Sequence, residues 1–333
     1  MWEHLSFARS ALDDLERGAI AAGVREGRLV RVIRGCFVAH EVWSMWFPEQ
    51  RLLARTLAVA AVNARCAPLF SHQSAAALWG IPLYGLRDLR VHTLTPTARP
   101  GRSSATVARH LGEWCSSDET QIFGIRVTSL TRTILDLARC ASPEMAISAA
   151  DSGMRLLFGA QREGVSDPAH EWRAEQLALL DRFPGHRGVR KARHLLKFAD
   201  PRADSPVESV SRLCLERLDI DVDIQVRVDG VGGARYWVDF EFLGQGIFGE
   251  VDGQAKYLDA ELRGGRSAEA VVVLEKERED QIRGITGNSM VRWPPKALTS
   301  VRTLGERLHS FGVEVPNLGR APSRRPAQHE RFH

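Results

Sequence analysis

The stretch Tyr236-Trp-Val-Asp-Phe-Glu-Phe-Leu-Gly-Gln-Gly-Ile-Phe-Gly-Glu-Val-Asp-Gly-Gln-Ala-Lys-Tyr257 decides the fold of the carboxy-terminal part of this chain. It predicts two strands, over residues 236–242 and 247–251, joined by a glycine-rich turn. Asp239 stands inside the first apolar run, where an isolated carboxylate is costly unless it is paired or bound to a metal. The stretch therefore predicts a hairpin that carries a functional carboxylate.

Two further acids, Glu250 and Asp252, flank Val251 in the second strand. Because side chains alternate along a strand, we expect both carboxylates on one face and Val251 on the other. If the two strands are hairpin neighbours, Asp239 and Glu250 meet at one end of the sheet. Converging carboxylates favour Mg²⁺ or Mn²⁺, and such an ion activates water and offsets charge on a phosphodiester.

The flanking sequence extends this hairpin into a helix-and-sheet domain. Residues 199–206 are rich in proline and small polar residues and predict a linker. Ser205 then resembles an N-cap, with Pro206 at the first helical position and Glu208 in the first turn. Beyond this helix, which runs to about residue 218, the patterns predict strands over 222–228 and 290–293 and helices over 254–262, 267–285 and 296–311. The tail, 313–333, is rich in proline and arginine and is predicted to be disordered.

This order of elements resembles the PD-(D/E)XK nuclease superfamily, and within it the small domains similar to very-short-patch-repair endonucleases. The motifs that match are Val238-Asp239-Phe240, Glu250-Val251-Asp252-Gly253 and Lys256-Tyr257. Glu208 matches the first-helix acid that many members place beside the metal, and 275–280 and 291–293 resemble the closing helix and strand. The resemblance implies Asp239, Glu250 and Glu208 as metal ligands, with Asp252 and Lys256 as further catalytic residues.

One position departs from that superfamily. Its members usually have lysine two residues after the second acid, where it orients the attacking water, and this chain has Asp252. Lys256, at the start of the next helix, is a candidate substitute. The rival interpretation is a nuclease fold that has lost activity and keeps its acids for hydrogen bonding.

Residues 5–40 predict two short helices followed by a basic hairpin, the order of a winged helix-turn-helix. The first helix would present Leu5, Ala8, Leu12 and Leu15, the second spans 19–26, and two β segments over 29–38 break at Gly35. Four arginines fall on the second helix and the hairpin, where a DNA backbone would lie: Arg25, Arg28, Arg31 and Arg34. The alternative is a solvated arginine face on a small packing module.

The middle of the chain, 51–199, predicts a mixed α/β domain. Helical patterns cover 51–67, 71–79, 129–157, 171–182 and 188–198, and short alternating segments between 88 and 127 predict a small sheet. Three histidines here, His72, His92 and His110, lack partners at metal-binding spacing and are interpreted as structural.

Three segments of this amino-terminal half resemble the AbiEi-type antitoxin family, whose members carry an amino-terminal winged helix and repress abortive-infection operons. They are GVREGRLVRVIRGCFV at 23–38, SHQSAAALWG at 71–80 and VTSLTRTILDLA at 127–138. The resemblance implies a DNA-binding repressor with an operon-encoded toxin as partner.

Composition narrows the class of protein further. Hydrophobic residues make up 44% and charged residues 26%, as in globular proteins, and no run of about 18 apolar residues predicts a membrane span. The five cysteines are scattered without a C-x-x-C pair, so neither a zinc ribbon nor a disulfide framework is indicated, and free, buried thiols are predicted. The acidic amino terminus does not resemble a signal peptide, so we expect a cytoplasmic protein.

Together these patterns predict an α/β (α+β) chain with a winged helix over 1–50, a mixed α/β domain over 51–199 and a restriction-endonuclease-like domain over 205–312. The expected function is a Mg²⁺-dependent DNA endonuclease in phage defence or DNA repair. The alternative is a non-catalytic DNA-binding regulator that retains the nuclease fold. DNA is the expected partner, no membrane partner is expected, and a homodimer or a toxin partner stays open.

Overall fold

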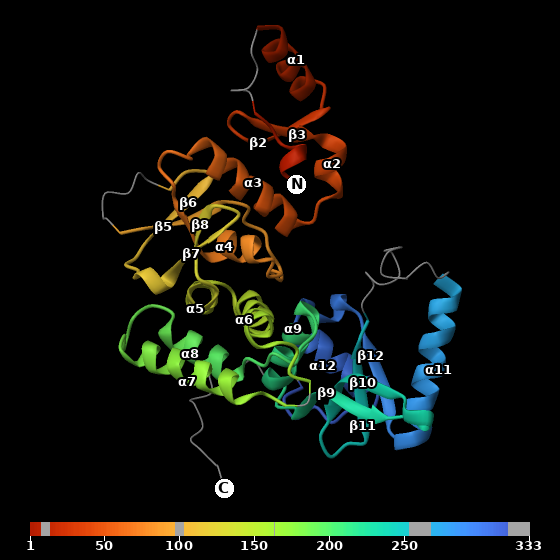
Figure 1. The fold of residues 1–333 in the computed structure, drawn as a ribbon. Helices are drawn as coiled ribbons and strands as arrows, with labels where there is room; N and C mark the ends of the chain where they lie inside the picture. The colour runs from red at the N-terminus through yellow and green to blue at the C-terminus, as the bar shows by residue number, and fades with distance from the viewer. Residues whose placement is uncertain (8–13, 97–102, 163, 253–267, 319–333) are drawn as a thin grey trace. The chain divides into compact units, whose positions relative to one another are not determined.

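The computed structural model describes residues 1–7, 14–96, 103–162, 164–252 and 268–318. The α+β class predicted from the sequence is confirmed. The chain divides into two compact units (Figure 1). Unit 1 comprises Met1–Gly159 and Ser166–Pro201, and unit 2 comprises Ala160–Val165 and Arg202–His333.

Unit 1 begins with a small sheet and one helix. The elements are η1 (Trp2–His4), β1 (Ser6–Phe7), α1 (Asp14–Arg25), β2 (Leu29–Ile33) and β3 (Cys36–Ala39). The strands pair in the order β1-β3-β2. The helix predicted from Leu5 onward is therefore wrong at Ser6 and Phe7, which pair with Phe37 and Cys36. At Ser6 and Phe7, pairing with the distant strand β3 overrides the local preference for a helix. The rest of the predicted helix, residues 8–13, lies outside the described residues.

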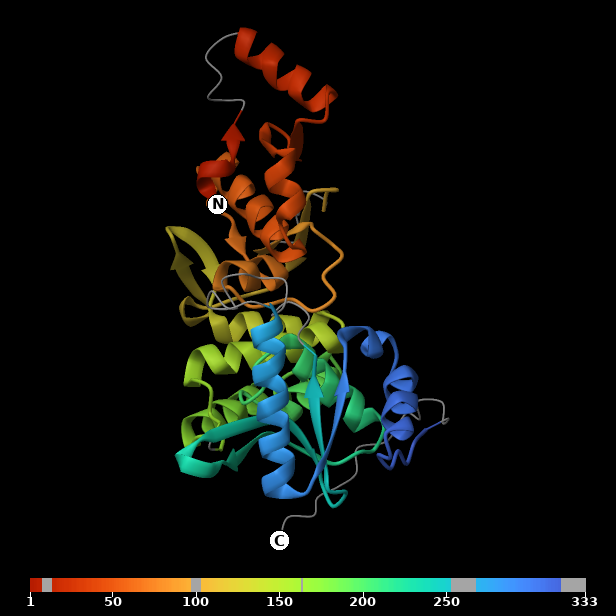
Figure 2. The same cartoon turned by 90° about the vertical axis from the view of Figure 1, so that its right-hand side faces the viewer.

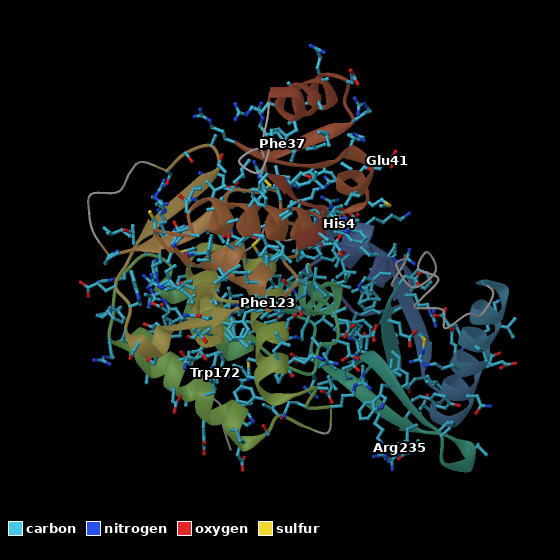
Figure 3. The ribbon with its side chains drawn as sticks, turned by 45° about the horizontal axis from the view of Figure 1, so that its top comes forward. His4, Phe37, Glu41, Phe123, Trp172 and Arg235 are labelled. Atoms are coloured by element: carbon cyan, nitrogen blue, oxygen red, sulfur yellow. The ribbon has the colours of Figure 1, made fainter. Side chains whose placement is uncertain are left out.

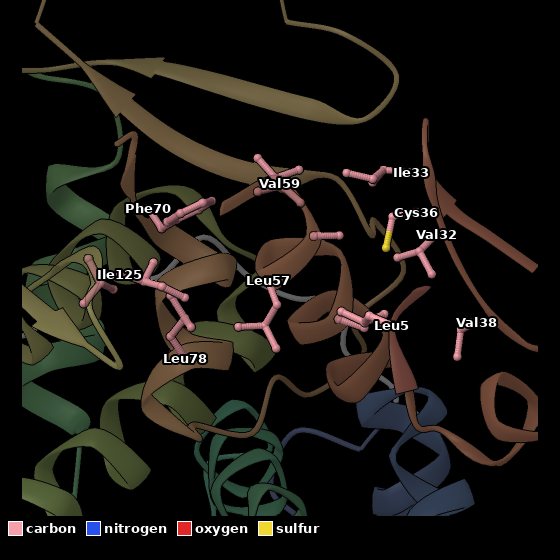
Figure 4. Packing of buried hydrophobic residues seen from close by; sticks show 14 of the residues in the cluster. Leu5, Val32, Ile33, Cys36, Val38, Leu57, Val59, Phe70, Leu78 and Ile125 are labelled. Carbon is pink, nitrogen blue, oxygen red and sulfur yellow. The ribbon is translucent and has the colours of Figure 1, made fainter. Parts of the chain in front are cut away.

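The β2–β3 hairpin and the following helices share one hydrophobic core. After α2 (His40–Met45), helix α3 (Pro48–Val62) packs its buried face on β2. Val32 and Cys36 from the hairpin, Leu57 from α3 and Phe70 from β4 (Leu69–Phe70) belong to this core, as Figure 4 shows. Residues on both sides of position 50 therefore fold against each other.

A five-stranded sheet forms the centre of unit 1. Its order is β6-β5-β4-β8-β7, and the remaining strands are β5 (Val91–Thr95), β6 (Val107–Leu111), β7 (Glu119–Ile122) and β8 (Ile125–Thr128). The small sheet predicted between 88 and 127 is confirmed, whereas β4 was not predicted. Helix α4 (His72–Trp79) follows β4, and its Trp79 Nε1 donates to the Thr128 carbonyl at 3.0 Å.

Four further helices complete unit 1, close to the predicted bounds: α5 (Leu130–Cys140), α6 (Pro143–Phe158), α7 (Asp167–Asp181) and α8 (Val189–Phe198). Trp172 of α7, labelled in Figure 3, is buried and donates to Thr131 Oγ1 at 3.0 Å. Of the five cysteines, all free, Cys36 and Cys214 are buried. The other three are exposed, so the prediction of buried thiols is wrong for them.

Unit 2 is built on a four-stranded sheet in the order β12-β11-β10-β9. Its strands are β9 (Val222–Asp229), β10 (Arg235–Phe242), β11 (Ile247–Val251) and β12 (Ser289–Trp293). The first three pair antiparallel, and β12 runs parallel to β11. A parallel neighbour requires a crossover connection, and the described part of that connection is α11 (Ala268–Thr286).

Helices cover both faces of this sheet. α11 lies over one face, and α9 (Pro206–Arg217) and α12 (Val301–Ser310) lie over the other, as the two views in Figures 1 and 2 agree. On the α9 side, the Trp293 ring lies tilted against the Phe240 ring and donates from Nε1 to Ser211 Oγ at 2.9 Å. On the α11 side, Val238, Phe248 and Ile282 pack together. A 3-10 turn, η5 (Pro295–Thr299), leads into α12.

The predicted start of α9 is confirmed: Ser205 is the N-cap, and its hydroxyl accepts from the Glu208 backbone N–H at 3.2 Å. The predicted helix over 254–262 and most of the predicted disordered tail lie outside the described residues. Among the helices that the structure describes, none is long and apolar enough to cross a membrane.

Candidate functional site

Asp239 and Glu250 lie on adjacent strands of unit 2. The β10–β11 pairing runs from Phe242 opposite Ile247 to Phe240 opposite Gly249, so Asp239 and Glu250 are the next residues on the two strands. At this point the Asp239 carboxylate accepts a hydrogen bond from the Val251 backbone N–H at 2.9 Å. The prediction that these strands are hairpin neighbours is confirmed.

Glycine precedes Glu250 because the space beside it is filled. A Cβ at Gly249 would lie 2.7 Å from Trp293 and 3.0 Å from Phe242, and both aromatic side chains are fully buried. This close packing seats the Gly249 backbone against Trp293 and Phe242 on the α9 side of the sheet. It thereby fixes the strand position from which Glu250 projects.

Glu250 is buried, with 8% of its surface exposed, and arginines occupy both of its oxygens. Arg278 Nη1 lies 2.6 Å from Oε1, and Arg292 Nη2 lies 2.9 Å from Oε2. A buried carboxylate needs such compensation, because burial removes the water that stabilises its charge. Arg278 also donates to the carbonyl oxygen of Trp237 on β10.

Two acids on α11 extend this charged group. Arg292 lies 3.3 Å from Glu279 and 3.8 Å from Glu275. These glutamates are four residues apart and therefore share one face of the helix. The α11 face of the sheet thus carries Glu250, two arginines and two further carboxylates in one network.

Glu208 is held on the other side, at the start of α9. Its carboxylate accepts from the Ser205 hydroxyl at 2.8 Å, the Asp204 backbone N–H at 2.9 Å and Gln225 Nε2 at 2.9 Å. Burial raises the pKa of Glu208 above its ordinary value, while these donors pull it down. Gln225 has a positive φ of 50° inside β9, a conformation that is uncommon for residues other than glycine. The register of β9 with β10 sets this irregular residue opposite Asp239.

The other predicted catalytic residues are partly described. Asp252 directly follows β11, is half-buried, and donates its backbone N–H to the Trp293 carbonyl at 2.9 Å. Lys256, the candidate substitute for the missing lysine, lies outside the described residues. The structure therefore brings Asp239, Glu250 and Asp252 to one end of the β10–β11 hairpin.

The donor set fits Mg²⁺ in kind but does not form a closed cage. Within the described ranges, no three side chains of His, Cys, Asp or Glu are grouped so that they could hold a metal. Mg²⁺ commonly binds one or two carboxylates and completes its octahedron with water and substrate phosphate. Asp239 and Glu250 supply two carboxylates. The two guanidinium groups paired with Glu250 show that positive charge is needed at this position.

The predicted DNA-contacting arginines all lie at the surface of unit 1. Arg25 ends α1, Arg28 precedes β2, Arg31 is on β2 and Arg34 is in the β2–β3 turn, and all four are exposed. Arg28 pairs with Glu26, and the guanidinium of Arg31 lies 5.9 Å from the Phe37 ring. Helix α1 comes directly before the β2–β3 hairpin, so the four arginines lie within one short stretch of unit 1.

Sequence reasoning missed a histidine cluster in unit 1. His110 on β6 stacks on His72 with ring centroids 3.7 Å apart, and His92 Nδ1 lies 2.8 Å from His110 Nε2. Asp136 of α5 approaches His72, with Oδ2 4.0 Å from Nδ1. Because the rings are stacked nearly parallel, their nitrogens do not converge as metal ligands would. Four elements supply these groups, so no local spacing could have revealed them.

Burial sets the charge state of this cluster. It lowers the pKa of His92 to about 4 and that of His72 well below its ordinary value, and neighbouring histidines lower both further. Burial also raises the pKa of Asp136, opposed by Arg132, whose Nε lies 3.0 Å from Oδ1. Among the described residues, His92 Nε2 and Asp136 Oδ2 are buried without a hydrogen-bond partner. The interpretation of these histidines as structural groups stays a prediction, and His92 has a partner at Nδ1 but none at Nε2.

Comparison with known proteins adds relatives but no activity. No protein-family model matches the chain. Two uncharacterized proteins of Mycobacterium tuberculosis, from strains CDC 1551 and H37Rv, are each 27% identical to it over 229 residues. The alignment covers 68% of this chain and 74% of each relative. Any function for this chain must therefore be argued from its own residues.

Proposed function

We propose that unit 2 is a divalent-metal-dependent DNA endonuclease, with Asp239 and Glu250 as the principal metal ligands. The observation that carries the proposal is their position on neighbouring strands, where the side chain of Asp239 bonds to the backbone N–H next to Glu250. Two acids at the end of a buried hairpin, surrounded by arginines, match the needs of phosphodiester chemistry. We also propose a cytoplasmic location, where the DNA substrate would be available.

The residues have distinct roles in this proposal. A bound Mg²⁺ or Mn²⁺ would supply an activated water and offset negative charge on the phosphate. Asp239 is oriented by the Val251 N–H, and Glu250 is held by its buried strand. Glu208, aligned by Ser205 and Gln225 at the start of α9, is proposed as a further acid of the site, outside the pair formed by Asp239 and Glu250. Asp252 and Lys256 are proposed to assist the water or the phosphate.

The amino-terminal unit is proposed to hold the DNA. Arg25, Arg28, Arg31 and Arg34 are exposed on a helix and hairpin, where guanidinium groups can bind phosphates without reading sequence. The resemblance to AbiEi-type antitoxins adds transcriptional repression and a toxin partner as proposed properties. A role in phage defence or DNA repair follows from combining this unit with a nuclease, and a homodimer is compatible with it.

A second function, a non-catalytic DNA-binding regulator, is favoured by one specific observation. Both oxygens of Glu250 are bonded to arginines, and Asp252 stands where the superfamily has its lysine. In that case the acids stabilise the sheet through ion pairs, and unit 2 is a scaffold. The two functions differ in whether the protein cuts DNA.

The test is cleavage of supercoiled plasmid in Mg²⁺, with EDTA added to a parallel reaction. We expect nicking by the wild-type chain that EDTA stops, and loss by orders of magnitude in Glu250→Gln, as when a metal-activated nucleophile is removed. Glu241→Gln is the matched control, because Glu241 lies on β10 and is only half-buried. No cleavage by the wild type would favour the regulator, whereas cleavage that persists in Glu250→Gln would exclude Glu250 as an essential metal ligand.

A further inference from the structure

Glu250 shares its two oxygens between two arginines that come from different elements. Arg278 projects from α11 and Arg292 from β12, and they lie 2.6 Å and 2.9 Å from the two carboxylate oxygens. The arginine side chains are 30% and 26% exposed, against 11% for Glu250. The carboxylate is therefore fixed in the interior, while both guanidinium groups retain access to solvent.

Each arginine also has a second anchor that does not depend on Glu250. Arg278 donates to the Trp237 carbonyl, and Arg292 faces Glu279 and Glu275 on α11. Losing Glu250 as a partner would therefore leave neither guanidinium without an acceptor. Breaking these pairs costs less than breaking an isolated buried ion pair, where one charge is left uncompensated.

We propose that Arg278 and Arg292 form a clamp on Glu250 that competes with the divalent cation, and that both guanidinium groups turn to the DNA phosphate when Glu250 becomes a metal ligand. This inference rests on the proposed nuclease function. We call Arg278 and Arg292 together the arginine clamp.

Charge explains why Glu250 cannot pair with both arginines and bind a divalent cation at the same time. A dication within a few ångströms of two guanidinium groups is repelled, and the repulsion is strong where the dielectric constant is low. A phosphate diester, by contrast, accepts two parallel N–H bonds from arginine and adds negative charge. The arginine clamp therefore keeps Glu250 neutralised without DNA and supplies phosphate contacts with it.

The experiment measures Mn²⁺ binding to the full chain without DNA, from the electron paramagnetic resonance signal of the free ion. In Arg278→Met, removal of one competing cation should tighten Mn²⁺ binding by about tenfold, equivalent to about 1.4 kcal/mol. Cleavage at saturating Mn²⁺ should nevertheless fall at least tenfold in this variant, because a phosphate contact is lost. Arg283→Met is the matched control on the same helix, since Arg283 is 54% exposed and contacts Glu279 rather than Glu250.

A second variant guards against a failure of Arg278→Met to fold. Arg278→Lys keeps the positive charge. An ammonium group lacks the planar fork with which Arg278 donates to Glu250 and to the Trp237 carbonyl at the same time. Its Mn²⁺ affinity should rise by a smaller factor, about threefold. The melting temperature with and without Mn²⁺ shows whether each variant is folded.

The outcomes separate the clamp from the nuclease proposal. If wild-type Mn²⁺ binding depends on Glu250 but neither Arg278 variant binds Mn²⁺ more tightly, the clamp is wrong and the proposed metal site stands. If no protein binds Mn²⁺ in a Glu250-dependent way, the proposed function fails and the clamp with it. Tighter binding in Arg278→Met, with Arg283→Met unchanged, supports both.

Discussion

Lowering the pH should destabilise unit 1, because the buried His92 resists protonation in the folded chain. Its pKa in the folded chain is about 4, against 6.5 for an exposed histidine, chiefly because its ring is buried. The unfolded chain therefore takes up the proton first. The stability that His92 contributes is complete above pH 6.5 and is lost as the pH falls toward 4.

The size of this effect follows from the two pKa values. Between pH 7 and pH 5, His92 alone should remove about 2 kcal/mol from the free energy of unfolding of unit 1. The groups around it add to the effect or oppose it. His110 and Arg90 disfavour the protonated ring, and Asp88 favours it.

The assay is hydrogen exchange in urea at pH 7 and pH 5, read on peptides that contain β5 and β6. His92→Gln cannot take up the proton, so the pH-dependent loss should shrink by about 2 kcal/mol in this variant. His170→Gln, which removes an exposed histidine of unit 1, should behave like the wild type. Equal pH dependence in wild type and His92→Gln would refute the buried-histidine reasoning.

Three further predictions concern unit 2 and the DNA-binding surface. Gly249→Ala should lower the free energy of unfolding by about 1–3 kcal/mol in urea denaturation, because the added Cβ meets Trp293 and Phe242. The control Gly284→Ala on α11 has open space around it and should be neutral or slightly stabilising. Equal effects of the two substitutions would contradict the packing argument. Lys256→Ala should suppress cleavage without changing Mn²⁺ affinity, whereas Asp252→Ala should weaken that affinity; a silent Lys256→Ala would exclude it as the substitute lysine. Replacing Arg25 and Arg34 by Gln should flatten the log–log salt dependence of DNA binding by about two units, and an unchanged slope in filter binding would assign this surface to another partner.

Point variants are the appropriate test of the amino-terminal surface. Leu5, Val32 and Cys36 share a core with Leu57 and Phe70. Deleting residues 1–50 would therefore expose the apolar faces of α3 and β4, and a loss of DNA binding could come from unfolding.

The parts of unit 2 that local patterns determine were predictable. β11 has the predicted bounds, β10 differs by one residue, and the Ser205 cap begins α9 as expected. Alternating apolar residues and a capping serine act within a few positions, so one sequence contains the whole signal. The adjacency of Asp239 and Glu250 followed from the short hairpin turn between them.

The partners of the site residues were not predictable in the same way. Arg278 reaches Glu250 across 28 positions and Gln225 reaches Glu208 across 17, through contacts that only the packed sheet and helices create. The same holds for β1, which is a strand because it meets β3. The histidine cluster is the extreme case, since His72, His92 and His110 come from three separate elements.

The most direct test of the metal site is anomalous diffraction from crystals of the full chain grown with Mn²⁺. We predict one Mn²⁺ peak within bonding distance of a carboxylate oxygen of Asp239 and one of Glu250, about 2.0–2.2 Å from each, with Arg278 and Arg292 withdrawn from Glu250. A peak elsewhere, or no peak while both arginines remain on Glu250, would contradict the assignment.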